Sequence, residues 1–173
     1  LYGLMLRSGN DAAVAIAEYI SGDVDSFAAL MNQEAAAMGA TRSHFVNPNG
    51  LPDENHYTCV YDMYLIFSNA VKNDTFVSII GTTSYDVTYT DASGEAVTHT
   101  WENTNQYLTG NATTPDGFQI VGGKTGTTGE AGYCLVLYSY NPSGQPIISI
   151  VFKADGKSNL YLLMNEMLQG FAI

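Results

Sequence analysis

Two short clusters of polar residues in this sequence combine the side chains that acyl-transfer chemistry requires. The first is Ser8-Gly9-Asn10, and the second is Lys124-Thr125-Gly126-Thr127, preceded by two glycines. A serine hydroxyl beside a lysine amine can relay a proton, and amide, hydroxyl and backbone N–H groups can bind carbonyl or carboxylate oxygens. Each cluster also has a simpler interpretation, because the first suits a helix cap and the second suits a glycine-threonine turn.

The order of the two clusters and the elements that carry them favour the chemical interpretation. Asn10 opens a predicted helix and Lys124 falls on a predicted strand, as do the second and third motifs of the set S-x-x-K, S-x-N and K-T-G. The first motif is missing, because no lysine of the chain has a serine three positions before it. We therefore expect a C-terminal portion that lacks the acylated serine and the general-base lysine.

Four segments resemble the serine-type D-alanyl-D-alanine carboxypeptidases, the low-molecular-mass penicillin-binding proteins of the β-lactamase/transpeptidase-like superfamily. They are residues 6–13, 44–51, 123–128 and 131–136, and the resemblance extends over nearly the whole chain. It implies a peptidase that removes the terminal D-alanine from peptidoglycan stem peptides through an acyl-enzyme and is acylated by β-lactams. The implied substrate is a peptidoglycan pentapeptide ending in D-Ala-D-Ala. The implied protein is exported, extracytoplasmic and part of the cell envelope, with a signal segment before Leu1, and it needs no cofactor.

The resemblance also implies a role for each residue of the two clusters. Ser8 relays a proton between the lysine of the missing motif and the leaving amine, and Asn10 binds the acyl-side amide of the substrate. Lys124 lies against Ser8, polarises this relay and adds positive potential where the substrate carboxylate binds. These three residues are the predicted catalytic residues of the chain.

Three further residues are predicted to bind the substrate. Thr125 and Thr127 offer hydroxyls to its carboxylate, and the backbone N–H of Thr127 is one of two oxyanion donors. Gly126 leaves room for the peptide backbone to pair with the strand edge. Many relatives place an arginine near the end of the sheet to hold the carboxylate, and this chain has none there. The remaining cations considered and left outside the predicted site are Arg7, Arg42, Lys153 and Lys157.

The elements that must position these residues form an α+β fold of the β-lactamase/transpeptidase-like class, incomplete at its N-terminus. Residues 1–173 are predicted to be a single partial domain, with residues 1–80 mainly helical and residues 81–173 forming a hairpin, antiparallel strands and a C-terminal helix. Apolar spacing predicts helices over 10–20, from Asp23 to Gly39, over 58–71 with Thr58 as cap, and a helical turn near 76–80.

Alternating β-branched and aromatic residues predict the strands of the second part. A hairpin pairs 85–89 with 96–101, and an antiparallel meander follows over 119–128, 133–140 and 146–152. A final helix over 158–168 is predicted to lie against this sheet. Its apolar face is predicted to comprise Leu160, Leu163, Met164, Met167 and Leu168.

Composition limits the remaining possibilities. Lys and Arg total 6 against 17 Asp and Glu, so the formal charge of −11 excludes nucleic acid as a natural partner. His44 and His56 share a polar loop without helical ligand spacing, so no metal site is predicted. Cys59 and Cys134 match neither a zinc spacing nor a redox pair, and two buried thiols are favoured over a disulfide, which stays open.

Two other functions remain open at this stage. A serine β-lactamase shares the motifs but needs a deacylating base, and Glu54 is the only glutamate in the loop after Ser8-Gly9-Asn10 where one is expected. A non-catalytic peptidoglycan-binding or structural module would account for the missing nucleophile. For any of the three, an incomplete sheet and uncovered helices should make the chain associate with its missing N-terminal portion or with itself.

Overall fold

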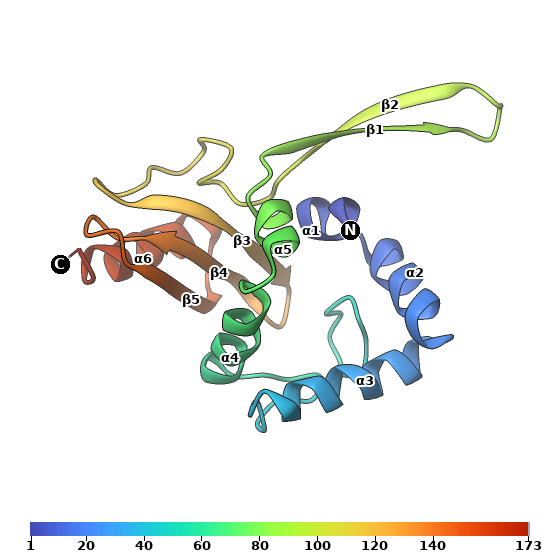
Figure 1. Ribbon diagram of the computed structural model, residues 1–173, viewed down its shortest axis with the longest axis horizontal. Helices are drawn as coiled ribbons and strands as arrows, with labels where there is room; N and C mark the ends of the chain where they lie inside the picture. The colour runs from blue at the N-terminus through green and yellow to red at the C-terminus, as the bar shows by residue number, and fades with distance from the viewer. Residues whose placement is uncertain (173) are drawn as a thin grey trace.

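The structure is a computed structural model that describes residues 1–172. Figure 1 shows the helices of the first half arranged on one side of a three-stranded sheet, with the C-terminal helix on its other side and a long hairpin projecting away. The helices are α1 (Tyr2–Arg7), α2 (Asn10–Ser21), α3 (Val24–Ala37), α4 (Val60–Ala70), α5 (Asp74–Ile80) and α6 (Lys157–Gln169). The strands are β1 (Ser84–Thr90), β2 (Ala96–Glu102), β3 (Gln119–Thr128), β4 (Gly132–Tyr140) and β5 (Pro146–Ala154).

The sheet has the order β3-β4-β5 and is antiparallel throughout. Successive residues of β4 point to opposite faces, so Leu135 and Leu137 face α6 whereas Val136 faces α4 and α5. Both faces of β4 are therefore buried, and the molecule has three layers in this region. The predicted meander is confirmed, and β3 has the predicted bounds.

Helix α6 covers one face of the sheet, as predicted, through side chains that are fully buried. Leu160, Met164 and Leu168 contact the sheet, and they are joined by Tyr161, which is 6% exposed. The prediction was wrong for Leu163, which is 39% exposed. Positions 160, 161, 164 and 168 share one helical face, and residue 163 falls on its flank.

The helical part differs from its prediction at two places. Helix α1 lies before the first predicted helix, in a segment for which no element was predicted. Helix α4 begins after Cys59, whose Sγ accepts a hydrogen bond from the N–H of Asp62 at 3.5 Å. Thr58 is not the cap, because its hydroxyl is bonded to the Ser43 hydroxyl at 2.7 Å. The predicted helices that correspond to α2, α3 and α5 are confirmed.

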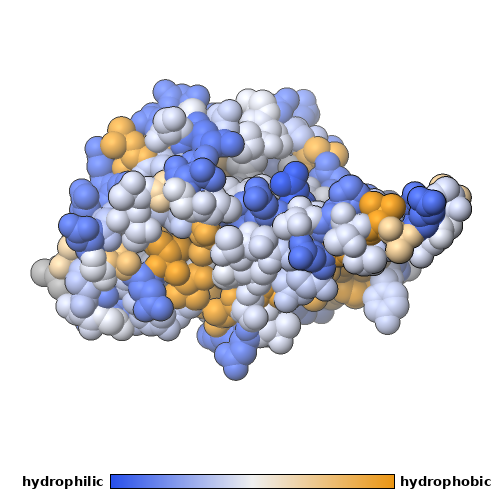
Figure 2. Space-filling model, turned by 90° about the horizontal axis from the view of Figure 1, so that it is seen from above, coloured by the Kyte–Doolittle hydropathy of each residue, from blue (hydrophilic) through white to orange (hydrophobic). Residues whose placement is uncertain are grey.

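Strands β1 and β2 form the predicted hairpin, and Figures 1 and 2 show it projecting beyond the rest of the molecule. The register pairs Tyr85 with Trp101. The base of the hairpin is held by the body, where the Tyr2 ring of α1 stacks on Tyr85 with centroids 4.1 Å apart. Beyond Glu102, the chain enters a long loop, residues 103–118, that contacts α1, β3 and α6. Among the described residues, no helix has the length and apolarity needed to cross a lipid bilayer.

Candidate active site

Ser8 lies at a reversal of the chain between two helices. Helix α1 ends there because Ser8 adopts the left-handed conformation, with φ 54° and ψ 41°, and its N–H donates to the carbonyl of Leu4. The next residue has little room, since a Cβ on Gly9 would lie 3.0 Å from an Asp11 side-chain oxygen and 3.3 Å from the carbonyl oxygen of Gly3. This turn exposes the Ser8 hydroxyl and places Asn10 in the first turn of α2.

Lys124 is carried by β3, which passes very close to the end of α5 and to β4. A Cβ on Gly122 would lie 2.5 Å from the carbonyl oxygen of Ile80, and a Cβ on Gly123 would collide with the carbonyl of Val136. The two glycines before Lys124 are thus required by packing. They let β3 lie deep enough in the molecule for the Lys124 side chain to face α1.

The structure brings the two polar clusters together. The Lys124 Nζ donates to the Ser8 Oγ at 2.5 Å and to the carbonyl oxygen of Thr125 at 2.6 Å. Burial between the helices and the sheet lowers the pKa of the Lys124 amine from 10.5 to about 8. An amine with this pKa is still mostly protonated at neutral pH, but it can exchange a proton with a hydroxyl more readily than a solvent-exposed lysine.

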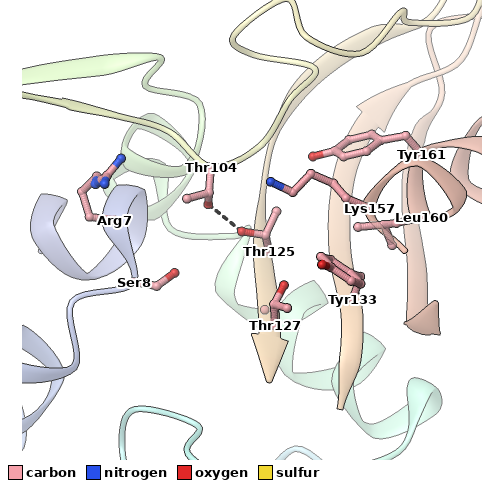
Figure 3. A pocket seen from close by; sticks show the side chains of 10 residues that line it. Arg7, Ser8, Thr104, Thr125, Thr127, Tyr133, Lys157, Leu160 and Tyr161 are labelled. Atoms are coloured by element: carbon pink, nitrogen blue, oxygen red, sulfur yellow. Dashed lines mark hydrogen bonds between the residues drawn. The ribbon is translucent and has the colours of Figure 1, made fainter. Parts of the chain in front are cut away.

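A pocket of about 230 Å³ opens beside this pair and is shown in Figure 3. Thr125 and Thr127 line its floor on β3, and nothing lies within 4 Å of the position a Cβ of Gly126 would take. The outer edge of β3 is therefore open to a ligand, because among the described strands β3 pairs only with β4.

Six of the residues that line this pocket were not included in the predicted site, namely Arg7, Thr104, Tyr133, Lys157, Leu160 and Tyr161. Lys157, in the first turn of α6, extends its amine toward Thr125, and Arg7 lies on the opposite side (Figure 3). Thr104, from the loop after β2, bonds to Thr125 across a 2.5 Å hydroxyl–hydroxyl distance. Lys157 and Arg7 are cations that the sequence offered and that the prediction left outside the site, whereas nothing in the sequence marked Thr104. The lining residues include two cations and no carboxylate.

Asn10 borders a second and larger hollow, which we call the apolar groove, together with Ser8 and Lys124. The groove has a volume of about 570 Å³. Its walls come from α1, α3, α4, α5 and the face of the sheet opposite α6. Its apolar lining includes Leu4, Met5, Met31, Phe45, Met63, Phe67, Phe76, Val136 and Phe152.

The histidines and cysteines considered in the sequence analysis, all within residues 1–172, show no arrangement suited to binding a metal ion. Among the described residues, no group of three or more His, Cys, Asp and Glu side chains could hold a metal ion. His44 Nδ1 is 2.6 Å from the carbonyl oxygen of Asn55, and His56 Nδ1 accepts from the N–H of Val46. Cys59 and Cys134 are free and partly buried.

Comparison with known proteins identifies the class to which this fold and site belong. Residues 1–156 match peptidase family S11, D-alanyl-D-alanine carboxypeptidase, and the chain belongs to this family. It is 35% identical over 97% of its length to the D-alanyl-D-alanine carboxypeptidase DacF of Bacillus subtilis, and 34% identical over its whole length to that of Streptomyces sp. strain K15. The chain spans 40% and 60% of these two relatives, respectively.

Solved structures show the same relationship. The S96A mutant of Streptomyces K15 DD-transpeptidase superposes on the whole chain with a TM-score of 0.89 and 32% identity, and the chain covers 67% of it. A penicillin-binding protein homologue from Mycobacterium tuberculosis superposes with a TM-score of 0.81 and 27% identity. The predicted α+β, transpeptidase-like fold and the predicted family are confirmed.

Proposed function

We propose that this chain is the C-terminal part of a serine peptidase that removes the terminal D-alanine from peptidoglycan stem peptides and is acylated by penicillins. The observation that carries the proposal is the Lys124–Ser8 hydrogen bond, which joins positions 116 residues apart in the sequence. This bond lies beside a cationic pocket of suitable size for one amino acid with a free carboxylate. The nucleophile is supplied by an S-x-x-K segment outside this chain.

In the proposed reaction, the external serine attacks the carbonyl of the scissile D-Ala-D-Ala bond. The proton leaves through the lysine of its motif to Ser8, and the Ser8 hydroxyl delivers it to the nitrogen of the departing D-alanine. Lys124 favours this transfer because its positive charge stabilises a Ser8 oxygen that is losing its proton. Asn10 and the N–H of Thr127 bind oxygens on the acyl side of the substrate.

The carboxylate of the departing D-alanine binds in the 230 Å³ pocket. Thr125 and Thr127 donate hydroxyl hydrogen bonds to it, and Lys157 supplies a cation from the side of α6. The pocket contains no acidic side chain that would repel the anion. Lys157, at the start of α6, is thus proposed to hold the substrate carboxylate, a role that many relatives give to an arginine near the end of the sheet.

The apolar groove is proposed to receive the helix that carries the S-x-x-K motif. Its apolar walls suit an amphipathic helix, and Ser8, Asn10 and Lys124 at its rim would surround the nucleophile. Without this helix, the chain is expected to bind the separately expressed N-terminal portion or to self-associate. Light scattering tests this expectation. A chain that stays a monodisperse monomer and does not bind an added N-terminal portion would contradict the proposal.

Two further expectations follow from the same proposal. The complete protein would act outside the cytoplasmic membrane, where its substrate is. It would also turn penicillin over slowly, because Glu54, the one glutamate considered as a deacylating base, is exposed and is not among the residues that line the apolar groove. A fast penicillin hydrolysis would favour the β-lactamase alternative.

The central experiment is acylation by a fluorescent penicillin. The complete protein should be labelled, whereas the chain by itself should not. Ser8→Ala should slow acylation by about 100-fold or more, as expected for loss of a positioned proton relay. Ser93→Ala, in the turn of the projecting hairpin, is the matched control and should react at the normal rate. Labelling of the isolated chain, or normal acylation of Ser8→Ala, would disprove the assigned roles.

A further inference from the structure

Thr104 connects α1 and β3, which lie on opposite sides of the 230 Å³ pocket. Its backbone N–H donates to the carbonyl of Leu6 at 3.2 Å, and Leu6 belongs to α1, the helix that ends at Ser8. Its hydroxyl is 2.5 Å from the Thr125 hydroxyl on β3, and Figure 3 shows this bond at the centre of the pocket. One residue is therefore bonded both to the element that positions the relay serine and to the strand that carries Lys124.

The backbone around Thr104 is held by two buried asparagines. The Asn103 side-chain amide donates to the carbonyl of Thr82 at 2.9 Å, and its Oδ1 accepts from the N–H of Asn105 at 2.9 Å. The Asn105 Oδ1 in turn accepts from the N–H of Tyr107 at 3.2 Å. Asn103 and Asn105 are 5% and 0% exposed. Since both neighbours are fixed, the exposed Thr104 side chain is presented to the pocket in a defined position.

We propose that Thr104 is a positioning residue for substrate recognition: it orients the Thr125 hydroxyl so that its proton points to the carboxylate of the departing residue. Thr104 acts through Thr125 and does not touch the reacting atoms. The inference deepens the proposed function and rests on it, because it assumes that an anionic peptide terminus occupies this pocket.

The direction of the hydrogen bonds follows from the charge of the ligand. A carboxylate can only accept, so Thr125 must donate to it. The remaining acceptor site of the Thr125 oxygen then faces Thr104, which donates. The two hydroxyls form a chain that ends on the anion, and each bond polarises the next. Without the Thr104 hydroxyl, the Thr125 side chain is free to rotate away and to donate elsewhere.

The test compares Thr104→Val, which keeps the shape and removes the hydroxyl, with Thr104→Ser, which keeps the hydroxyl, in the complete protein. For a peptide ending in D-Ala-D-Ala, Thr104→Val should raise KM about 10-fold with little change in kcat. The same peptide with a C-terminal carboxamide should react equally with both variants. Thr104→Ser should restore KM to within about threefold, and Thr109→Val, in the same loop, is the control.

A double variant separates positioning from general damage. Thr104→Val combined with Thr125→Val should be no worse than Thr125→Val alone, because Thr104 acts only through that hydroxyl. Equal losses for the carboxylate and carboxamide peptides, or additive losses in the double variant, would overturn the inference.

A measurement without substrate keeps the inference distinct from the proposed function. In the NMR spectrum, the Thr125 methyl group should report one side-chain rotamer in the parent protein and rotamer averaging in Thr104→Val. An unchanged Thr125 rotamer would refute the role of Thr104 even if the protein proves to have no peptidase activity. Absence of penicillin labelling in the parent protein, by contrast, would refute the proposed function. The rotamer measurement would then still test whether Thr104 orients the Thr125 side chain.

Discussion

Replacing Lys124 by methionine should make the protein more stable at neutral pH while abolishing the activity proposed for the complete protein. Burial lowers the pKa of the amine from 10.5 to about 8, so the folded state disfavours the charged form. At about 1.4 kcal/mol for each pKa unit, the cost of holding the cation in the folded state is about 3 kcal/mol. Methionine cannot form the hydrogen bonds that Lys124 donates to Ser8 and Thr125, and their loss offsets about 1 kcal/mol of this gain in stability. We therefore expect Lys124→Met to raise the free energy of unfolding by about 2 kcal/mol at pH 7.

The pH dependence gives the sign of this effect independently. Below the folded pKa of about 8, the amine is charged in both states and the full cost is present. Between about 8 and 10.5, the folded protein has lost the proton while the unfolded chain still holds it, so the cost declines as the pH rises. Relative to Lys124→Met, the parent protein should therefore gain stability across this interval.

Urea unfolding at pH 7 and at pH 10 measures both quantities. Lys72→Met is the matched control, because Lys72 is an exposed lysine beyond the end of α4 and its removal should change little. The stability difference between the parent protein and Lys124→Met should be largest at pH 7 and smaller at pH 10. A variant that is less stable than the parent at pH 7, or a difference that does not depend on pH, would refute the reasoning.

Three further predictions concern the scaffold. Gly123→Ala should lower the free energy of unfolding by about 3 kcal/mol, because the added methyl group would collide with the Val136 carbonyl. Gly126→Ala should lower it by at most about 1 kcal/mol, because the space around Gly126 is open. Urea unfolding of the two variants tests this difference. Burial opposes ionisation of Asp62, but hydrogen bonds from a serine hydroxyl and a backbone N–H outweigh it and hold its pKa below the usual value. Its contribution to stability should thus be present at neutral pH and be lost on acidification through that lowered pKa, and Asp62→Asn should flatten this part of the acid-unfolding curve. Leu137→Ala, in the fully buried layer between the sheet and α6, should cost about 2–5 kcal/mol and lower the melting temperature measured by calorimetry.

The regular elements of this fold were predictable because their sequence signals are local. Apolar β-branched and aromatic residues predict β4 and β5, whereas β3 is a shorter apolar start followed by glycines and threonines. The turn residues between these strands favour an antiparallel order. The caps were less predictable: Cys59 replaces Thr58 as the first residue before α4, because Thr58 finds a partner in the distant Ser43. Helix α1 escaped prediction since six residues without an N-terminal cap carry little periodic signal.

The proposed site divides in the same way. The motifs Ser8-Gly9-Asn10 and Lys124-Thr125-Gly126 are readable because their residue types, order and supporting elements are properties of the sequence. Thr104 is not readable in this way, because it reaches the pocket only through the loop that contacts β3. Lys157 is visible as a lysine after the last strand, but its place in the pocket depends on how α6 packs.

The sequence by itself thus determined the family, the α+β architecture and the chemical groups of the proposed site. Only the tertiary structure decided which of those groups meet. The left-handed turn at Ser8 and the glycines before Lys124 let two distant segments approach to hydrogen-bonding distance. The same approach buries the Lys124 amine and lowers its pKa. This burial comes from segments far away in the sequence, so the residues next to Lys124 could not predict it.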